Sequence, residues 1–110
     1  MKFTQEHMTK AAEKWAALYE AVKCIEVGDG TITEARAMMK RAYPKITWNQ
    51  TVIQLIVMER NGYIEGVRNA DGKVMKPMAV KITEKGHAYF KRMIEETKEM
   101  AKELGIAGEG

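Results

Sequence analysis

Apolar residues recur every three or four positions in the first quarter of the chain. The residues of this stripe are Trp15, Leu18, Tyr19, Val22 and Ile25. Because an α-helix completes a turn every 3.6 residues, this spacing places them on one buried side of a helix. Thr4 supplies a capping hydroxyl at the start of this helix, and Gly28-Asp29-Gly30 favours its end.

Two further helices are predicted in the middle of the chain. The β-branched run at residues 31–33 favours a brief strand, which is followed by a helix over residues 34–42 that Pro44 stops. Thr31 with Glu34, or Thr33 alone, offers the capping chemistry for that helix. The next helix begins at the capping box Thr47-Trp48-Asn49-Gln50 and runs to about Arg60. Its apolar residues lie nearly all round it, so we expect this helix to be central in the fold.

After Asn61-Gly62 the hydrophobic pattern becomes that of strands. Residues 63–68 and 74–82 are predicted to pair, and the Asp71-Gly72 between them is typical of a hairpin turn. Pro77 cannot donate to a ladder, which favours an edge position or a bulge. Thr83 then caps a last helix, predicted to reach Leu104.

The order of these elements predicts the fold. Helix, short strand, helix, helix, β-hairpin and long C-terminal helix is the order of an α+β winged helix-turn-helix domain. We expect one such domain over residues 1–104, with extended terminal helices and the hairpin as its wing, followed by a flexible tail at residues 105–110. The alternative is a small α+β domain of similar layout in which the hairpin packs elsewhere.

The residue inventory excludes several chemistries. The chain has one cysteine, Cys24, and two distant histidines, His7 and His87, so no metal-ligand spacing can be assembled. No phosphate-binding glycine loop or nucleophile motif occurs. We therefore expect no enzyme activity, no metal and no cofactor. The lone thiol, the absence of a secretory signal and the absence of a long apolar run predict a cytoplasmic protein without a membrane partner.

Positive charge is concentrated in the middle of the chain. Residues 34–85 carry ten Lys and Arg against five Asp and Glu, whereas both ends are slightly acidic and the whole chain has a net charge of +3. This asymmetry is typical of a surface that faces a polyanion, although an ordinary lysine-rich surface would also produce it.

Two segments carry a family resemblance. The runs RNGYIEGV at residues 60–67 and VKITEKGHAYFKRM at residues 80–93 resemble the small YjcQ-like winged-helix proteins of Gram-positive bacteria and their prophages. The resemblance covers roughly residues 15–95. It implies a winged-helix fold and a phage-linked or regulatory setting, and it implies no catalytic residues.

A helix-turn-helix protein inserts the second helix of the pair into the major groove, so candidate DNA contacts follow from the predicted elements. The candidates on that helix are Trp48, Asn49, Thr51 and Gln54. The candidate cations around it are Arg36, Lys40, Arg41, Lys45, Arg68, Lys73 and Lys76. No Lys or Arg lies between Trp48 and Glu59, so its leading turns lack the common arginine–guanine contact. Binding to double-stranded DNA would therefore depend on phosphate contacts.

The terminal helices carry a second apolar pattern. Met93, Thr97, Met100 and Leu104 recur at spacings of four, three and four, close to those of a coiled-coil seam. Either this helix packs on the first helix of the same chain, or the two helices form a homodimer. We expect a dimer, which would place two wings at paired half-sites. Its expected interface consists of Trp15, Tyr19, Met93, Thr97, Met100 and Leu104.

Two functions follow from these patterns. We expect a small phage- or prophage-type winged-helix DNA-binding protein that acts as a transcriptional regulator. The alternative is a protein-interaction module on the same fold that binds a host protein, such as a phage-encoded, anti-CRISPR-like inhibitor of a host defence system. The cation-free leading turns of the third helix and the nine methionines of the chain favour this alternative.

Overall fold

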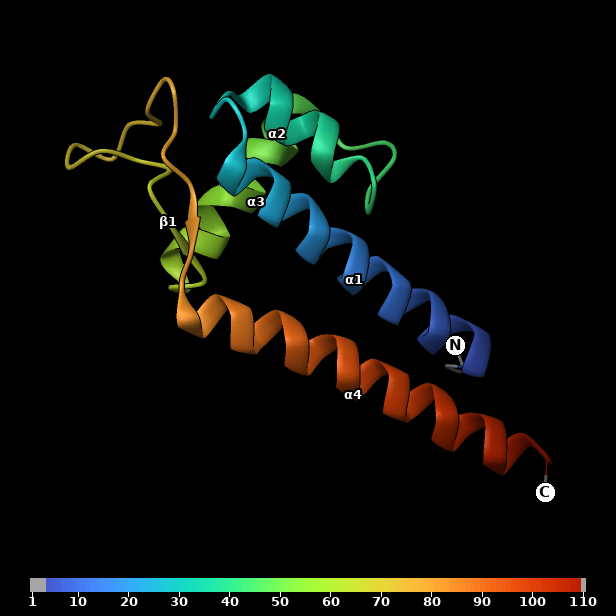
Figure 1. The fold of residues 1–110 in the computed structure, drawn as a ribbon. Coiled ribbons are helices and arrows are strands. Elements are labelled where there is room, and N and C mark those ends of the chain that lie inside the picture. Colours follow the sequence, from blue (N-terminus) through green and yellow to red (C-terminus); the bar gives the residue numbers. More distant parts are fainter. Residues whose placement is uncertain (1–3, 110) are drawn as a thin grey trace.

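The computed structural model describes the backbone of residues 4–109 and the side chains of residues 4–105. It has an α+β fold with two long terminal helices (Figure 1). The elements, in chain order, are α1 (Gln5–Val27), α2 (Ile32–Met39), α3 (Trp48–Arg60), β1 (Ile64–Glu65), β2 (Lys81–Ile82) and α4 (Glu84–Glu109). No helix within these residues combines the length and apolar character that crossing a bilayer requires.

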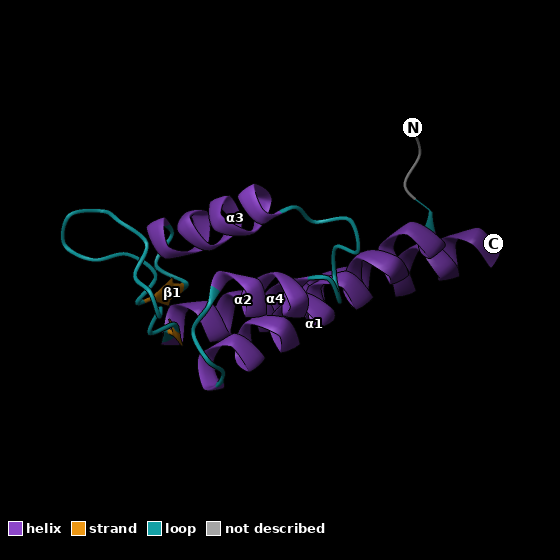
Figure 2. Cartoon of the chain, turned by 90° about the horizontal axis from the view of Figure 1, so that it is seen from above, coloured by secondary structure: helices purple, strands orange, loops and turns teal. Residues whose placement is uncertain are grey.

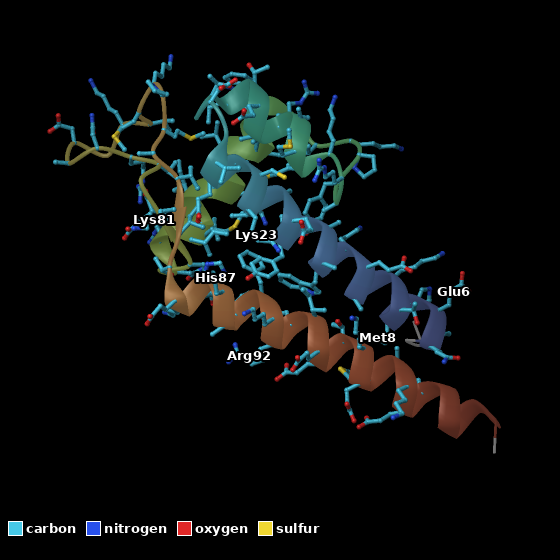
Figure 3. All side chains as sticks on the ribbon, in the orientation of Figure 1. Glu6, Met8, Lys23, Lys81, His87 and Arg92 are labelled. Atoms are coloured by element: carbon cyan, nitrogen blue, oxygen red, sulfur yellow. The ribbon has the colours of Figure 1, made fainter. Side chains whose placement is uncertain are left out.

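The two terminal helices lie side by side and run in opposite directions (Figure 1). Their paired outer ends extend away from the other elements, which gives the molecule dimensions of 55 × 28 × 24 Å. Near the other end, Tyr19 of α1 stacks on Phe90 of α4 with ring centroids 5.3 Å apart. The Tyr19 hydroxyl is hydrogen-bonded to His87 Nδ1 at 2.6 Å. In Figure 3 His87 marks the start of α4, while Arg92 lies on the side of α4 away from α1.

A single hydrophobic core joins the remaining elements to this helix pair. Its fully buried large side chains are Phe90, Leu18, Ile25, Met39, Leu55, Ile64, Val22 and Val67. They come from all four helices and from the first arm of the hairpin, while Met78, Val80 and Ile82 of the returning arm are also buried at 5% exposure. Every element therefore contributes to the one core.

The helix starts confirm the capping predictions. Thr4 accepts a hydrogen bond from His7 N, and Thr47 forms the expected capping box with Gln50. Thr83 Oγ1 accepts from Gly86 N at 3.0 Å at the start of α4. Each hydroxyl satisfies a backbone donor that has no partner inside the helix, which is why α1, α3 and α4 begin where the sequence predicts. The start of α2, at Ile32, lies two residues before its predicted start.

The short strand predicted at residues 31–33 is wrong. Thr31 is instead the N-cap of α2, and its hydroxyl accepts from Glu34 N at 3.1 Å. The Glu34 carboxylate accepts from Asp29 N at 2.8 Å and Gly30 N at 3.3 Å. These side-chain acceptors favour a helix start at this segment in place of a strand. The helix also ends earlier than predicted, at Met39.

The paired strands of the hairpin are shorter than the pattern predicts. Ile64 pairs with Ile82 and Glu65 with Lys81, and Arg68 forms an isolated bridge to Val74. Between these pairs the arms are also joined by Met75 N, which donates to Val67 O, and by Ala79 N, which donates to Gly66 O, both at 2.9 Å. Met78 N turns away from the facing arm and donates to Gly30 O at 2.6 Å. The peptide bond before Pro77, within this irregular stretch, is cis.

The third helix is not central, contrary to prediction. Thr51, Leu55 and Met58 are buried on its inner side, but Ile53 is 59% exposed and Val57 46% exposed. Figure 2 shows α3 on the outside of the molecule, separate from the α1–α4 pair. The apolar residues of α3 exceed what one buried face can cover, so some of them face solvent.

The last helix continues past its predicted end at Leu104. The backbone is helical to Glu109, so most of the tail expected at residues 105–110 is helix, and Gly110 lies outside the described residues. Gly105 lies directly under the side chain of Gln5, where a Cβ atom would collide with it. Contact with the first residue of α1 thus accompanies the continuation of α4.

The Glu59 carboxylate fastens the hairpin to the end of α3. Its Oε2 accepts from Val67 N at 2.9 Å and Arg68 N at 3.1 Å, and its Oε1 accepts from Arg68 Nε at 2.6 Å. Burial raises the pKa of Glu59, but these hydrogen bonds, led by the one from the Arg68 side chain, outweigh it and hold the pKa below its usual value.

We expect Glu59→Gln to lower the free energy of unfolding by about 1–2 kcal/mol at neutral pH, because charged acceptors make the stronger hydrogen bonds. The stability that the ionised carboxylate adds is complete above its usual pKa of 4.5 and is lost as the pH falls through the lowered value. The difference from the parent protein in urea unfolding should therefore shrink in acid. The exposed Glu65→Gln is the control, and an equal loss there would contradict this role of Glu59.

Gly66 lets the two arms of the hairpin approach each other. Its φ is +85°, and an added Cβ atom would collide with the carbonyl of Ala79. Gly72 at the hairpin tip has a similar φ of +79° but no atom within 4 Å of the Cβ position. Gly72→Ala should cost about 1 kcal/mol for the left-handed backbone, and Gly66→Ala at least about 1 kcal/mol more for the collision. Urea unfolding of both variants measures the difference, and equal costs would refute it.

Candidate functional site

The outward face of α3 changes character along its length. Asn49 and Gln50 are exposed at its start, Ile53 and Val57 follow, and Arg60 ends it. Thr47 N donates to Gln50 Oε1 at 3.0 Å, so the amide oxygen of Gln50 is engaged and its NH₂ group remains as donor. The face therefore offers amide groups in its first turn, apolar contacts in the next two turns and a cation at its end.

A hollow of about 360 Å³ adjoins the first residue of α3. It is lined by Trp48, by residues 30–33 at the start of α2, and by residues 75–77 of the returning hairpin arm. The N-terminal ends of two helices thus lie close to the hairpin, and exposed Lys76 belongs to the lining. Helix N-termini carry partial positive charge, so this corner favours anions.

On the other side of α3 lies a larger open groove of about 650 Å³, which we call the α3 groove. The turn between α2 and α3 supplies Tyr43, Pro44 and Ile46 to its wall, and α3 supplies Ile53. Lys14 of α1 and Lys45 add ammonium groups, and the side-chain amides of Gln50 and Gln54 complete it. The Lys14 ammonium lies 5.2 Å from the centroid of the Tyr43 ring.

The three candidate arginines already have partners within the fold. Arg68 is paired with Glu59 at 2.6 Å. Arg36 Nε donates to Ile46 O at 2.9 Å and so holds the turn before α3. Arg41 lies with a guanidinium nitrogen 3.5 Å from Cys24 Sγ. Arg36 and Arg68 are only half-exposed. They stabilise the turn and the hairpin beside the site and offer little surface to a partner.

Thr51 does not belong to the contact surface. It is fully buried, and its hydroxyl donates to Thr47 O at 2.9 Å. A thymine methyl group cannot reach it, so the predicted contact is wrong. The periodicity of α3 could not show this, because the apolar residues surround the helix and leave its inner side undefined.

No family model, curated protein or solved structure matches this chain.

The remaining candidates flank the first half of α3. Lys45 lines the α3 groove beside Gln54, and Lys76 lines the hollow beside Trp48. Asn49 is exposed on the outward face. The fold therefore brings these residues to one end of α3, whereas Lys40 is exposed at the end of α2 and Lys73 at the hairpin tip.

Most residues that line the α3 groove were not predicted from the sequence, among them Lys14 and Ile53. Lys14 comes from α1, about thirty positions before the turn whose Tyr43 it contacts, and no local pattern connects them. Ile53 belongs to the helix that the apolar pattern predicts to be central, but it forms part of an open groove. The only available signal for Ile53 was the surplus of apolar residues on α3.

The expected dimer residues lie along the α1–α4 pair. Tyr19 and Thr97 are buried within the single chain, and Trp15 packs against Phe90 with ring centroids 6.4 Å apart. Met100 is 49% exposed, whereas Met93 and Leu104 are half-buried. Packing of the two helices within one chain, which the pattern left open, thus accounts for the buried part of the stripe.

Cys24 and His87 have separate side-chain partners, Arg41 for Cys24 and Tyr19 for His87. Cys24 is half-buried, and His87 is bonded to Tyr19 in α1 and not to a local partner. Within the described residues no three His, Cys, Asp or Glu side chains gather in a way that could hold a metal ion.

Proposed function

We propose that this chain is a cytoplasmic DNA-binding protein of the winged helix-turn-helix type, with α2 and α3 as the helical pair and residues 66–80 as the wing. One observation carries the proposal: the returning arm of the hairpin lies against the N-terminal ends of both α2 and α3. In winged and related readers, the N-terminal residues of the second helix meet the bases. This arrangement supports contact between this corner and DNA.

The chemistry of this corner favours phosphate contacts over base reading. Lys45 and Lys76 lie on opposite sides of the first turns of α3, and Lys73 extends from the hairpin tip. Asn49 is the candidate amide best placed to reach a base edge, because the oxygen of Gln50 is engaged in its cap. We therefore propose binding that is strongly salt-dependent and weakly sequence-specific.

The regulatory setting and the dimer are parts of the same proposal. The resemblance of residues 60–67 and 80–93 to YjcQ-like proteins supports a phage- or prophage-type regulator. Met100 is exposed on the outer part of α4, with Met93 and Leu104 half-buried along the same helix. These residues could bury further apolar surface against a second copy, and this supports a dimer.

Binding of a labelled double-stranded DNA should weaken steeply with salt. For about four phosphate contacts, raising NaCl from about 50 to about 200 mM should reduce the association constant by about 100-fold. Fluorescence anisotropy titrations at several salt concentrations give the slope. Absence of binding at the lowest salt would refute the proposal.

Lys45→Gln and Lys76→Gln should each reduce that salt slope by about one unit, because each removes one phosphate contact. Lys98→Gln, at an exposed position on the outer part of α4, is the matched control and should leave the slope unchanged. A control that weakens binding as much as the two test variants would indicate contact through general charge and not through this corner.

A second candidate function has its own support. Ile53 and Val57 expose an apolar stripe on α3, which favours a protein-interaction module that binds a host protein, such as an anti-CRISPR-like inhibitor. If this candidate is right, Ile53→Ser with Val57→Ser should abolish nuclease-resistant capture of a host protein. Lys45→Gln with Lys76→Gln should leave that capture intact. The reverse pattern of loss would refute it.

A further inference from the structure

We infer that the α3 groove binds a small amphipathic carboxylate, an aromatic or fused-ring acid. Tyr43, Ile46 and Ile53 give the groove apolar walls, so the larger part of the ligand must be a ring or an alkyl group. The volume of about 650 Å³ lies within the range of about 300–1,000 Å³ that is typical of small-molecule sites. An inorganic anion would leave these apolar walls without contacts.

The charge of the groove specifies an anion. Lys14 and Lys45 both line it, and no acidic side chain does so among the described residues. The ion pairs found within those residues involve other cations, so neither ammonium group is neutralised there. Lys14 lies over the edge of the apolar wall, 5.2 Å from the Tyr43 centroid. A ligand can therefore contact the ring and the ammonium group together.

The side-chain amide of Gln50 also favours an anion in the groove. The oxygen of Gln50 accepts from Thr47 N, which directs its donor NH₂ group to other partners. Lys14 and Lys45 also offer only donors. A carboxylate can accept from several of these donors at once, whereas a cation would find none of the carboxylates it needs.

Occupation of the groove would affect DNA binding, and this consequence rests on the proposed function. The carboxylate would engage Lys45, which the proposed phosphate surface also uses. A ligand on Lys45 and Gln54 would also cover part of the first two turns of α3. The acid and the duplex should therefore compete for the protein.

The site itself is tested without DNA. The fused-ring acid naphthoate is titrated into the full chain, and amide correlation spectra are recorded, with its neutral amide, naphthamide, as the comparison. We expect saturable shifts at the side-chain amides of Gln50 and Gln54 and at residues 43–46, with naphthamide at least about tenfold weaker. Equal affinity for the two compounds, or no saturation by about 1 mM, would overturn the inference.

Two matched variants locate the site. Ile53 and Val57 are exposed one turn apart on α3, but only Ile53 lines the groove. Ile53→Glu should weaken naphthoate binding at least about tenfold, and Val57→Glu should change it less than about twofold. Equal losses in the two variants would overturn the inference. Because both side chains are largely exposed, the unfolding midpoints should stay close to that of the parent protein.

Lys14→Met separates the site from the proposed DNA surface, to which Lys14 does not belong. It should weaken naphthoate binding and leave duplex binding unchanged, and retained naphthoate affinity would contradict the role of Lys14.

If naphthoate binds and no duplex does, the proposed function fails and the groove site stands. If duplex binds and naphthoate does not, the site fails alone. If both bind without competing, the proposed coupling fails.

Discussion

The carboxylate of Glu59 is the contact on which the functional corner depends. The two strands pair over only two residues each, and a ladder of that length cannot hold a hairpin in water. Glu59 adds three acceptor contacts from the end of α3, and the bond from Met78 N to Gly30 O ties down the returning arm. These contacts add to the hydrogen bonds between the two arms and keep residues 75–77 beside Trp48, where they form one of the three sides of the corner.

Two arginines and three lysines of the middle segment differ in what they contact. Arg36 and Arg68 donate to fixed acceptors within the fold, which suits a planar guanidinium with several directed N–H groups. Lys45, Lys73 and Lys76 remain exposed, as flexible ammonium groups that can reach a phosphate or a carboxylate. The net charge of this segment is therefore larger than the positive charge available to a partner. Arg36 is engaged in holding the turn before α3, and Arg68 in holding the hairpin.

The surplus of apolar residues on α3 connects the two functional ideas. A helix that packs on one side needs only one apolar stripe, yet Ile53 and Val57 lie outside that stripe and face solvent. Next to Lys14 and Lys45, Ile53 contributes to a groove with the chemistry of an amphipathic acid site. The same helix therefore offers a proposed DNA face and a proposed ligand wall, and the exchange between the two is its proposed regulation.

The local sequence determined where the helices begin, because Thr4, Thr47 and Thr83 satisfy backbone donors by contacts within a few residues. Hydrophobic periodicity likewise identified the long terminal helices. Only the tertiary structure decided that residues 31–33 form a helix start and that Thr51 is buried. It also decided the contact between Lys14 and Tyr43. These depend on which segments become neighbours after packing, and spacing along one segment carries no information about its partners.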